Sequence, residues 1–232
     1  MTGKSLFSDS ATSVVIAGKG GGKTGLLAAE ANKMQKFVFV DTIGVLNPRN
    51  ENRSAIIPDS NYFYSGDKGS GVDSFISWFS DPAAQKHDRH IIDISEAEDK
   101  KAEIEKLSTF LLQLGKKGNG YPFILDEISL IAPQSTRSGT VFKNLVIIGR
   151  NYGIKPIVMA TQRPQNTDKE VVELADENYL GYNKGFNTTE MLGKLADIDP
   201  AVFKKLEPRQ FYIVGTEKVY RVPNYKFANK QK

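Results

Sequence analysis

Short apolar runs alternate with helix-like segments along most of this chain. The runs 36–41, 89–94 and 122–127 are rich in consecutive apolar residues, and each contains an aspartate at or near its end. Apolar runs without polar alternation are typical of strands that are buried on both faces of a parallel sheet. Between them, the segment 96–114 repeats apolar residues at three- and four-residue spacings, which predicts an amphipathic helix. The pattern therefore predicts an α/β fold, with a mainly parallel central sheet and helices on both of its faces.

The same pattern predicts the remaining elements. The last two expected strands are separated by the turn residues 215–217, which is typical of a β-hairpin. No internal repeat or low-complexity segment interrupts the series, so we expect one domain. Further strands are expected at 13–16, 62–64, 157–160, 179–182, 211–214 and 219–222, and further helices at 25–34, 72–79, 140–150, 169–175 and 189–196.

Composition and charge narrow the class of protein. Hydrophobic residues make up 40% of the 232 residues and charged residues 25%, as in ordinary soluble domains. No apolar run approaches the ~18 residues of a membrane span. The absence of cysteine excludes disulfides and Cys-based zinc sites and fits a cytoplasmic setting. The net charge of +4 is concentrated at the end, because residues 218–232 hold five basic residues and no acidic ones.

A glycine-rich turn between an apolar run and a helix-like segment carries the strongest chemical pattern. Residues 16–24 read Ile-Ala-Gly-Lys-Gly-Gly-Gly-Lys-Thr, which is typical of a phosphate-binding loop, or Walker A motif, with Ala17 in place of the usual first glycine. Lys23 would reach the β- and γ-phosphates of ATP, and the Thr24 hydroxyl would bind Mg²⁺. The alternative is a flexible glycine turn, which the flanking strand and helix disfavour. The expected nucleotide-binding residues are Gly18, Lys19, Gly20, Gly21, Gly22, Lys23, Thr24 and Gly25.

Polar residues follow two other buried strands, where a parallel sheet binds its ligands. Asp126 and Glu127 end the run 122–127 and form a Walker B pattern, in which Asp126 would hold Mg²⁺ and Glu127 would polarise the attacking water. Gln162 follows the run 157–160 and could contact the γ-phosphate or that water. The alternatives are a helix cap for the acidic pair, and for Gln162 a turn residue before Pro164 that satisfies backbone groups.

Four segments in this order resemble a known family. Residues 17–24, 123–127, 149–154 (Gly-Arg-Asn-Tyr-Gly-Ile) and 159–164 (Met-Ala-Thr-Gln-Arg-Pro) are similar to the motifs of the FtsK–HerA superfamily of DNA-pumping ATPases. The resemblance implies a homo-hexameric ring that threads double-stranded DNA and hydrolyses ATP with Mg²⁺ at its subunit interfaces. It also implies Gln162 as a sensor and a finger arginine from the neighbouring subunit. Arg150 is the first candidate for this finger, before Arg163 and Arg209; the alternative for Arg150 is an arginine at a helix end.

In size the chain resembles the small genome-packaging ATPases of tailless, membrane-containing icosahedral viruses. By this resemblance, residues 1–215 would form the P-loop motor domain, and residues 216–232 a closing strand and basic tail. The protein would act in the cytoplasm or at a packaging vertex of the virion, together with a capsid, portal or membrane component.

Two polar loops are candidates for DNA contact. The segments 47–53 and 133–139 carry Arg49, Arg53 and Arg137 among Asn, Ser, Thr and Pro residues. Side chains of this kind bind phosphate without reading base sequence, as a translocase requires. The alternative is that both are ordinary exposed loops.

Three classes of function remain open at this point. The first is an ATP-driven motor for double-stranded DNA, in genome packaging or DNA transfer. The second is an assembly or secretion ATPase that acts on protein partners, as in filamentous-phage morphogenesis. The third is a nucleotide-dependent switch without turnover, which the Asp126–Glu127 pair disfavours.

Overall fold

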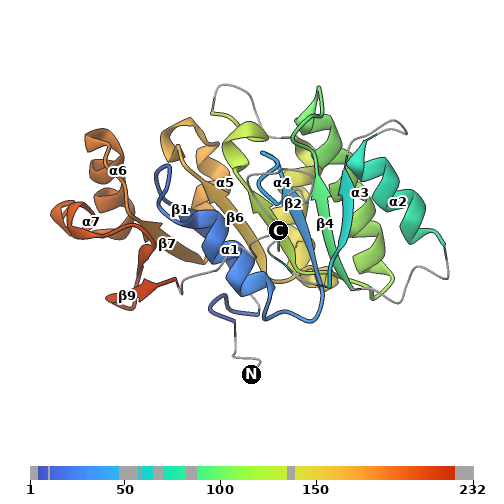
Figure 1. The fold of residues 1–232 in the computed structure, drawn as a ribbon, viewed down its shortest axis with the longest axis horizontal. Coiled ribbons are helices and arrows are strands. Elements are labelled where there is room, and N and C mark those ends of the chain that lie inside the picture. Colours follow the sequence, from blue (N-terminus) through green and yellow to red (C-terminus); the bar gives the residue numbers. More distant parts are fainter. Residues whose placement is uncertain are drawn as a thin grey trace, which may run out of the picture.

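A single twisted sheet forms the centre of the molecule, as a computed structural model of the chain shows (Figure 1). The structure describes residues 5–9, 11–46, 57, 59–64, 70–81, 88–134 and 139–222. Within these ranges nine strands join in the order β3-β4-β2-β5-β6-β1-β7-β8-β9. Strands β1 to β7 pair in parallel, and β8 and β9 are added antiparallel at one edge. The predicted α/β fold and the closing hairpin are confirmed.

The strands lie within a few residues of their predicted positions. The four central strands β1, β2, β5 and β6 are short and fully buried, as apolar runs that lie inside a two-sided sheet must be. The described strands are β1 (Thr12–Ile16), β2 (Phe37–Asp41), β3 (Asn61–Tyr64), β4 (Arg89–Asp93), β5 (Phe123–Asp126), β6 (Ile157–Thr161), β7 (Glu177–Gly181), β8 (Gln210–Ile213) and β9 (Lys218–Arg221).

The helices differ from the prediction mainly at their ends. The longest begins at Lys100 rather than at residue 96, because the Asp99 side chain accepts the backbone N–H of Ala102 at 2.9 Å and caps the helix there. The described α-helices are α1 (Lys23–Ala31), α2 (Gly71–Phe79), α3 (Lys100–Lys116), α4 (Thr140–Ile148), α5 (Lys169–Glu173), α6 (Phe186–Ala196) and α7 (Ala201–Lys205). Short 3₁₀ turns follow β5, α4 and β6: η2 (Ile128–Leu130), η3 (Gly149–Tyr152) and η4 (Pro164–Asn166).

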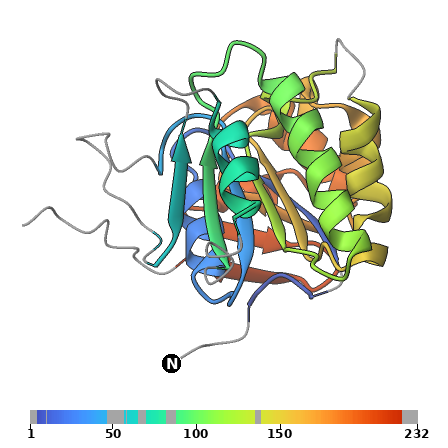
Figure 2. The same cartoon turned by 90° about the vertical axis from the view of Figure 1, so that its right-hand side faces the viewer.

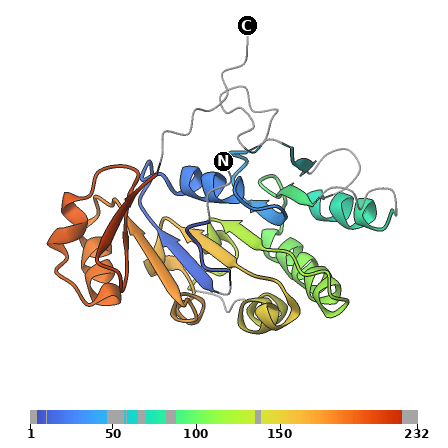
Figure 3. The same cartoon turned by 90° about the horizontal axis from the view of Figure 1, so that it is seen from below.

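Two hydrophobic cores lie on the two faces of the sheet. Helix α1 covers one face, whereas α3 and α4 cover the other (Figures 2 and 3). Successive residues of β1 alternate between them: Val15 packs on the α1 side, and Val14 and Ile16 pack on the side of α3 and α4. No described helix has the length and apolarity needed to cross a bilayer.

The strand order brings the predicted site residues together at the carboxyl ends of the parallel strands. Strands β5, β6 and β1 are neighbours, and all three run in the same direction. Their carboxyl ends therefore meet, and the residues that follow Ile16, Leu125 and Ala160 lie together. Strand β8 runs against β7, so its first residue, Gln210, returns to this same edge.

Candidate nucleotide-binding site

The glycine loop has the backbone conformation of an anion-binding turn. Gly20 and Gly22 have φ values of 75° and 95°, in the left-handed region that a side chain disfavours. Gly21 donates to the Gly18 carbonyl at 2.9 Å, and a Cβ atom at Gly21 would lie 2.9 Å from that carbonyl oxygen. The loop then enters α1, whose N-terminus carries a partial positive charge. Tight left-handed turns before a helix N-terminus fit a polyphosphate.

Lys23 lies at the base of this loop and is almost fully buried. Its ammonium donates to the Ala17 carbonyl at 3.0 Å. Burial lowers the pKa of Lys23, while the nearby carboxylates of Asp126 and Glu127 act in the opposite direction. A buried ammonium gains most from a further anion, because water no longer solvates it.

Asp126, the last residue of β5, is hydrogen-bonded to the first turn of α1. Its Oδ2 atom accepts the hydroxyl of Thr24 at 3.0 Å, and its backbone carbonyl accepts the hydroxyl of Thr42. Burial raises the pKa of Asp126 to about 7, and the charge of Asp41 adds to this shift, which Lys23 opposes. A hydroxyl and a carboxylate are both oxygen ligands of the kind that Mg²⁺ prefers, with water and phosphate completing its shell. The pair therefore fits a magnesium ion bound together with a nucleotide.

Glu127 lies beside Asp126 in an unusual backbone conformation. Its φ of 64° is left-handed, and it directs the carboxylate toward the end of β6. There it accepts the hydroxyl of Thr161 at 3.0 Å and the backbone N–H of Gln162 at 3.0 Å, as well as the hydroxyl of Ser129. Glu127 is thus held by two donors at the end of the neighbouring strand and by Ser129 in η2.

The predicted residues of the loop, the acidic pair and Gln162 therefore come together. The sequence did not identify Thr161 and Ser129 as partners of Glu127. It also did not show that two further buried aspartates lie beside Asp126 at the carboxyl ends of the strands. Asp41 of β2 is in register with Asp126 of β5 and with Asp93 of β4.

The three candidate arginines lie in different places. Arg150 lies in η3, where the strands begin, and it pairs with Asp176 at 3.7 Å. It is therefore remote from the glycine loop of its own chain. Arg163 is exposed and follows Gln162 at the carboxyl edge. Arg209 lies against the glycine loop itself, since its backbone N–H donates to Gly21 at 3.0 Å.

The candidate DNA contacts Arg49, Arg53 and Arg137 lie outside the described residues. Their role stays a prediction.

Comparison with solved structures assigns the fold. The chain is similar to the genome-packaging NTPase B204 of Sulfolobus turreted icosahedral virus 2 in its complex with AMPPCP, with a TM-score of 0.66 and 15% identity, over 90% of this chain and 95% of B204. This chain has the fold of a P-loop NTPase. It is also similar to B204 of Sulfolobus turreted icosahedral virus, described as a DNA-packaging ATPase, with a TM-score of 0.61 and 17% identity, over 91% of this chain and 96% of that one.

The fold expected from the resemblance to the FtsK–HerA superfamily is confirmed by this likeness. B204 has also been solved with ATPγS, at a TM-score of 0.65 and 15% identity. No protein-family model and no curated protein match the sequence.

Proposed function

We propose that this protein is an ATP-hydrolysing motor that translocates double-stranded DNA. The observation that supports hydrolysis best is the hydrogen bond from the Thr24 hydroxyl to the Asp126 carboxylate, with Glu127 as the next residue. This arrangement joins a phosphate-binding loop to a metal-binding carboxylate and to a candidate base. Phosphoryl transfer requires little more from a protein than this kind of positioning and charge stabilisation.

The residues divide the chemistry between them. Lys23 and the backbone of the glycine loop would bind the phosphates, and Thr24 and Asp126 would hold Mg²⁺, which neutralises phosphate charge when it is bound. Glu127 would orient the attacking water and take up its proton. Because Glu127 is bonded to the backbone of Gln162, any shift of the β6 end would move the base, which fits a role for Gln162 as a sensor of nucleotide state.

The proposal also includes the movement of double-stranded DNA. The motifs at 149–154 and 159–164 support it, and so does the shared fold with a DNA-packaging ATPase. In this proposal the chain forms a homo-hexameric ring, a neighbouring subunit supplies an arginine such as Arg150, and Arg49, Arg53 and Arg137 grip the DNA backbone. Such a ring would act in the cytoplasm or at a packaging vertex, on a capsid, portal or membrane component.

Steady-state ATP hydrolysis with and without linear double-stranded DNA tests this function. We expect DNA to stimulate hydrolysis, and we expect both the basal and the stimulated rates to vanish in Glu127→Gln. The glutamine keeps the size of the side chain but cannot accept a proton. Hydrolysis that DNA does not change would contradict the DNA motor and support an ATPase that acts on protein partners.

A further inference from the structure

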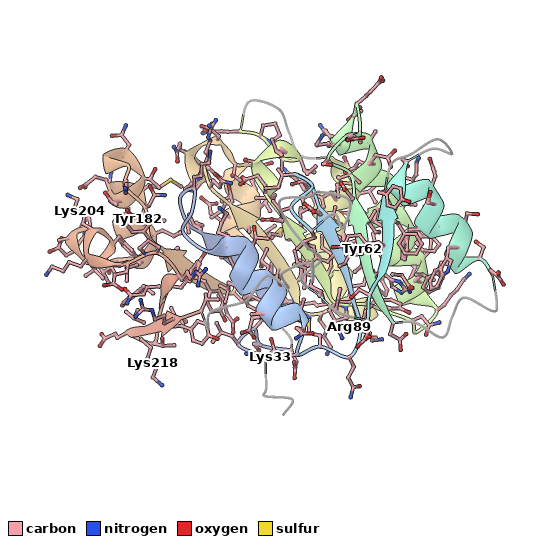
Figure 4. All side chains as sticks on the ribbon, viewed as in Figure 1. Lys33, Tyr62, Arg89, Tyr182, Lys204 and Lys218 are labelled. Atoms are coloured by element: carbon pink, nitrogen blue, oxygen red, sulfur yellow. The ribbon has the colours of Figure 1, made fainter. Side chains whose placement is uncertain are left out.

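The glycine loop lies between two different walls at the carboxyl edge of the sheet. The wall on the side of β5 and β6 holds Asp126 and Glu127, which act at the terminal phosphate in the proposed mechanism. The opposite wall comes from the loop after β7 and the turn before β8, on the side of α6 and α7, where Figure 4 labels Tyr182 and Lys204. A nucleotide whose γ-phosphate lay at Asp126 and Glu127 would have this second wall on the other side of its phosphate chain.

The second wall is connected to the glycine loop by backbone hydrogen bonds. The Tyr182 carbonyl accepts the backbone N–H of Gly18 at 2.9 Å. A Cβ atom at Gly18 would touch the side-chain amide of Asn183 at 3.4 Å. At the far end of the loop, the Gly21 carbonyl accepts the backbone N–H of Arg209 at 3.0 Å. Both ends of the loop are thus fixed to the segments around β7 and β8.

Arg209 has a backbone conformation that an arginine adopts only under constraint. Its φ is 71°, which is uncommon for any residue with a Cβ atom. Two hydrogen bonds hold it there, one to Gly21 and one from the backbone N–H of Val222 at 2.9 Å to the Arg209 carbonyl. Backbone strain of this kind is concentrated at functional sites.

The side chain of Arg209 lies on the loop as well. A Cβ atom at Gly22 would lie 3.0 Å from the Arg209 Cγ and 3.1 Å from its Cα. The first half of the side chain therefore packs on the last glycine before Lys23. From this position the rest of the side chain is long enough to bring its guanidinium to a phosphate chain held by the loop and the helix N-terminus. Guanidinium groups bind phosphate oxygens with charge-assisted hydrogen bonds.

We propose that Arg209 binds the α- and β-phosphates of a nucleoside polyphosphate in its own subunit, from the wall opposite Asp126 and Glu127. It is then a binding residue of the same chain, and a finger arginine acting on the neighbouring subunit must be another residue. The proposal rests on nucleotide binding by the glycine loop, which is part of the proposed function.

Equilibrium binding of ADP and ATPγS to the purified full chain tests the proposal. We expect Arg209→Gly to weaken both nucleotides alike, by about tenfold or more, because each loses one charge-assisted hydrogen bond. Glycine adopts the left-handed φ freely, so this variant removes the side chain without straining the turn. Lys218→Ala is the matched control: it removes an exposed cation from β9 of the same hairpin (Figure 4) and should leave both affinities unchanged.

A second variant separates the side chain from the flexibility of glycine. Arg209→Asn also tolerates a left-handed φ but carries no charge, so it should lose the same affinity; an asparagine variant that binds like the wild type would overturn the proposal. Equal affinities of Arg209→Gly and wild type would overturn it too. Wild-type protein that binds neither nucleotide would instead contradict the proposed function, and this inference with it.

Mixing two defective variants, at an ATP concentration too low to saturate Arg209→Gly, separates a role in the same subunit from a role in the neighbour. If Arg209 served the neighbouring site, a mixture of Arg209→Gly and Lys23→Ala chains would contain interfaces with every residue intact, and hydrolysis would recover. We expect no recovery, because every chain in the mixture then has a defect in its own site. Recovery above the rate of either variant alone would overturn the proposal.

Discussion

The carboxylate of Glu127 accepts the backbone N–H of Gln162, at 3.2 Å from Oε1 and 3.0 Å from Oε2. This hydrogen bond connects the candidate base, which follows β5, to the candidate sensor, which follows β6. The Thr161 hydroxyl adds a third contact, at 3.0 Å. The orientation of the base is therefore set by the neighbouring strand, and a ligand that moves the end of β6 also moves the base.

Thr161→Val should lower turnover without weakening nucleotide binding. The valine has nearly the same shape but cannot donate to Glu127, so the carboxylate loses one of its fixed donors. We expect kcat to fall on the order of tenfold and the free energy of unfolding to fall by about 1–3 kcal/mol. Measurements of kcat, of the Kd for ATPγS and of urea unfolding check this.

Thr109→Val is the control for this substitution. Thr109 is exposed on α3, and its hydroxyl donates to the Glu105 carbonyl of the same helix at 2.9 Å. We expect it to leave kcat unchanged. A Thr161→Val variant with wild-type kcat would show that the Thr161 hydroxyl does not position the base.

Thr24→Val should remove the effect of Mg²⁺ on nucleotide affinity. The Thr24 hydroxyl, which donates to Asp126 at 3.0 Å, is a proposed ligand of the ion. We expect wild-type protein to bind ATPγS more tightly in Mg²⁺ than in EDTA, and the variant to bind it equally in both. A variant that keeps the wild-type dependence on Mg²⁺ would contradict the assignment of Thr24.

Asp126→Asn should stabilise the nucleotide-free protein more at pH 8 than at pH 5. The pKa of Asp126 is about 7, against an ordinary value of 3.8, chiefly because the carboxyl is buried. Between these two values the folded protein holds a proton that the unfolded chain has lost, so the free energy of unfolding falls as pH rises from about 4 to about 7. Asparagine cannot ionise, so the variant does not lose stability in this way. At pH 8 its free energy of unfolding should exceed that of the wild type by on the order of 2–4 kcal/mol.

Asp73→Asn provides the contrast for this measurement. The exposed Asp73 has a pKa that Lys106 lowers by a hydrogen bond at 2.9 Å, so its charged form is favoured in the folded state. We expect no gain in stability at pH 8 from this variant. Urea unfolding of both variants at the two pH values decides the point, and an Asp126→Asn gain that does not change with pH would refute the shifted pKa.

Alanine at Gly21 and at Gly25 should act in opposite directions on the nucleotide-free protein. A Cβ atom at Gly21 would lie 2.9 Å from the Ala17 Cβ and the Gly18 carbonyl, so the loop would have to shift, at a cost of about 1–3 kcal/mol. A Cβ atom at Gly25 in α1 meets no described atom within 4 Å and should stabilise the helix by about 0.5–1 kcal/mol. Thermal unfolding of the two variants checks the sign, and a Gly21→Ala protein as stable as wild type would argue against this loop geometry.

The parts of the site that the sequence predicted are those carried by neighbouring residues. The glycine loop needs only a strand before it and a helix after it, and both are visible as apolar patterns around 16–24. Asp126 and Gln162 each follow a buried apolar run, and parallel strands bring such positions to one edge. The hydrophobic pattern was therefore enough to predict that they meet.

The remaining features depend on tertiary structure that local patterns do not contain. The left-handed backbone of Glu127 decides that its carboxylate faces Thr161, and nothing in the residue type predicts that conformation. Arg209 reaches the glycine loop only because β8 runs antiparallel to β7. Helix α7, the five residues Ala201–Lys205, was not predicted from the sequence.

ATP-driven displacement of a third strand from linear double-stranded DNA tests the proposed motor most directly. The substrate is a duplex that carries a triplex-forming oligonucleotide at one end, and the reading is the release of that oligonucleotide with time. We predict release that requires hydrolysable ATP and Mg²⁺, and none with ATPγS or with the Glu127→Gln protein. Wild-type protein that hydrolyses ATP in the presence of this DNA yet leaves the triplex intact would contradict translocation of double-stranded DNA.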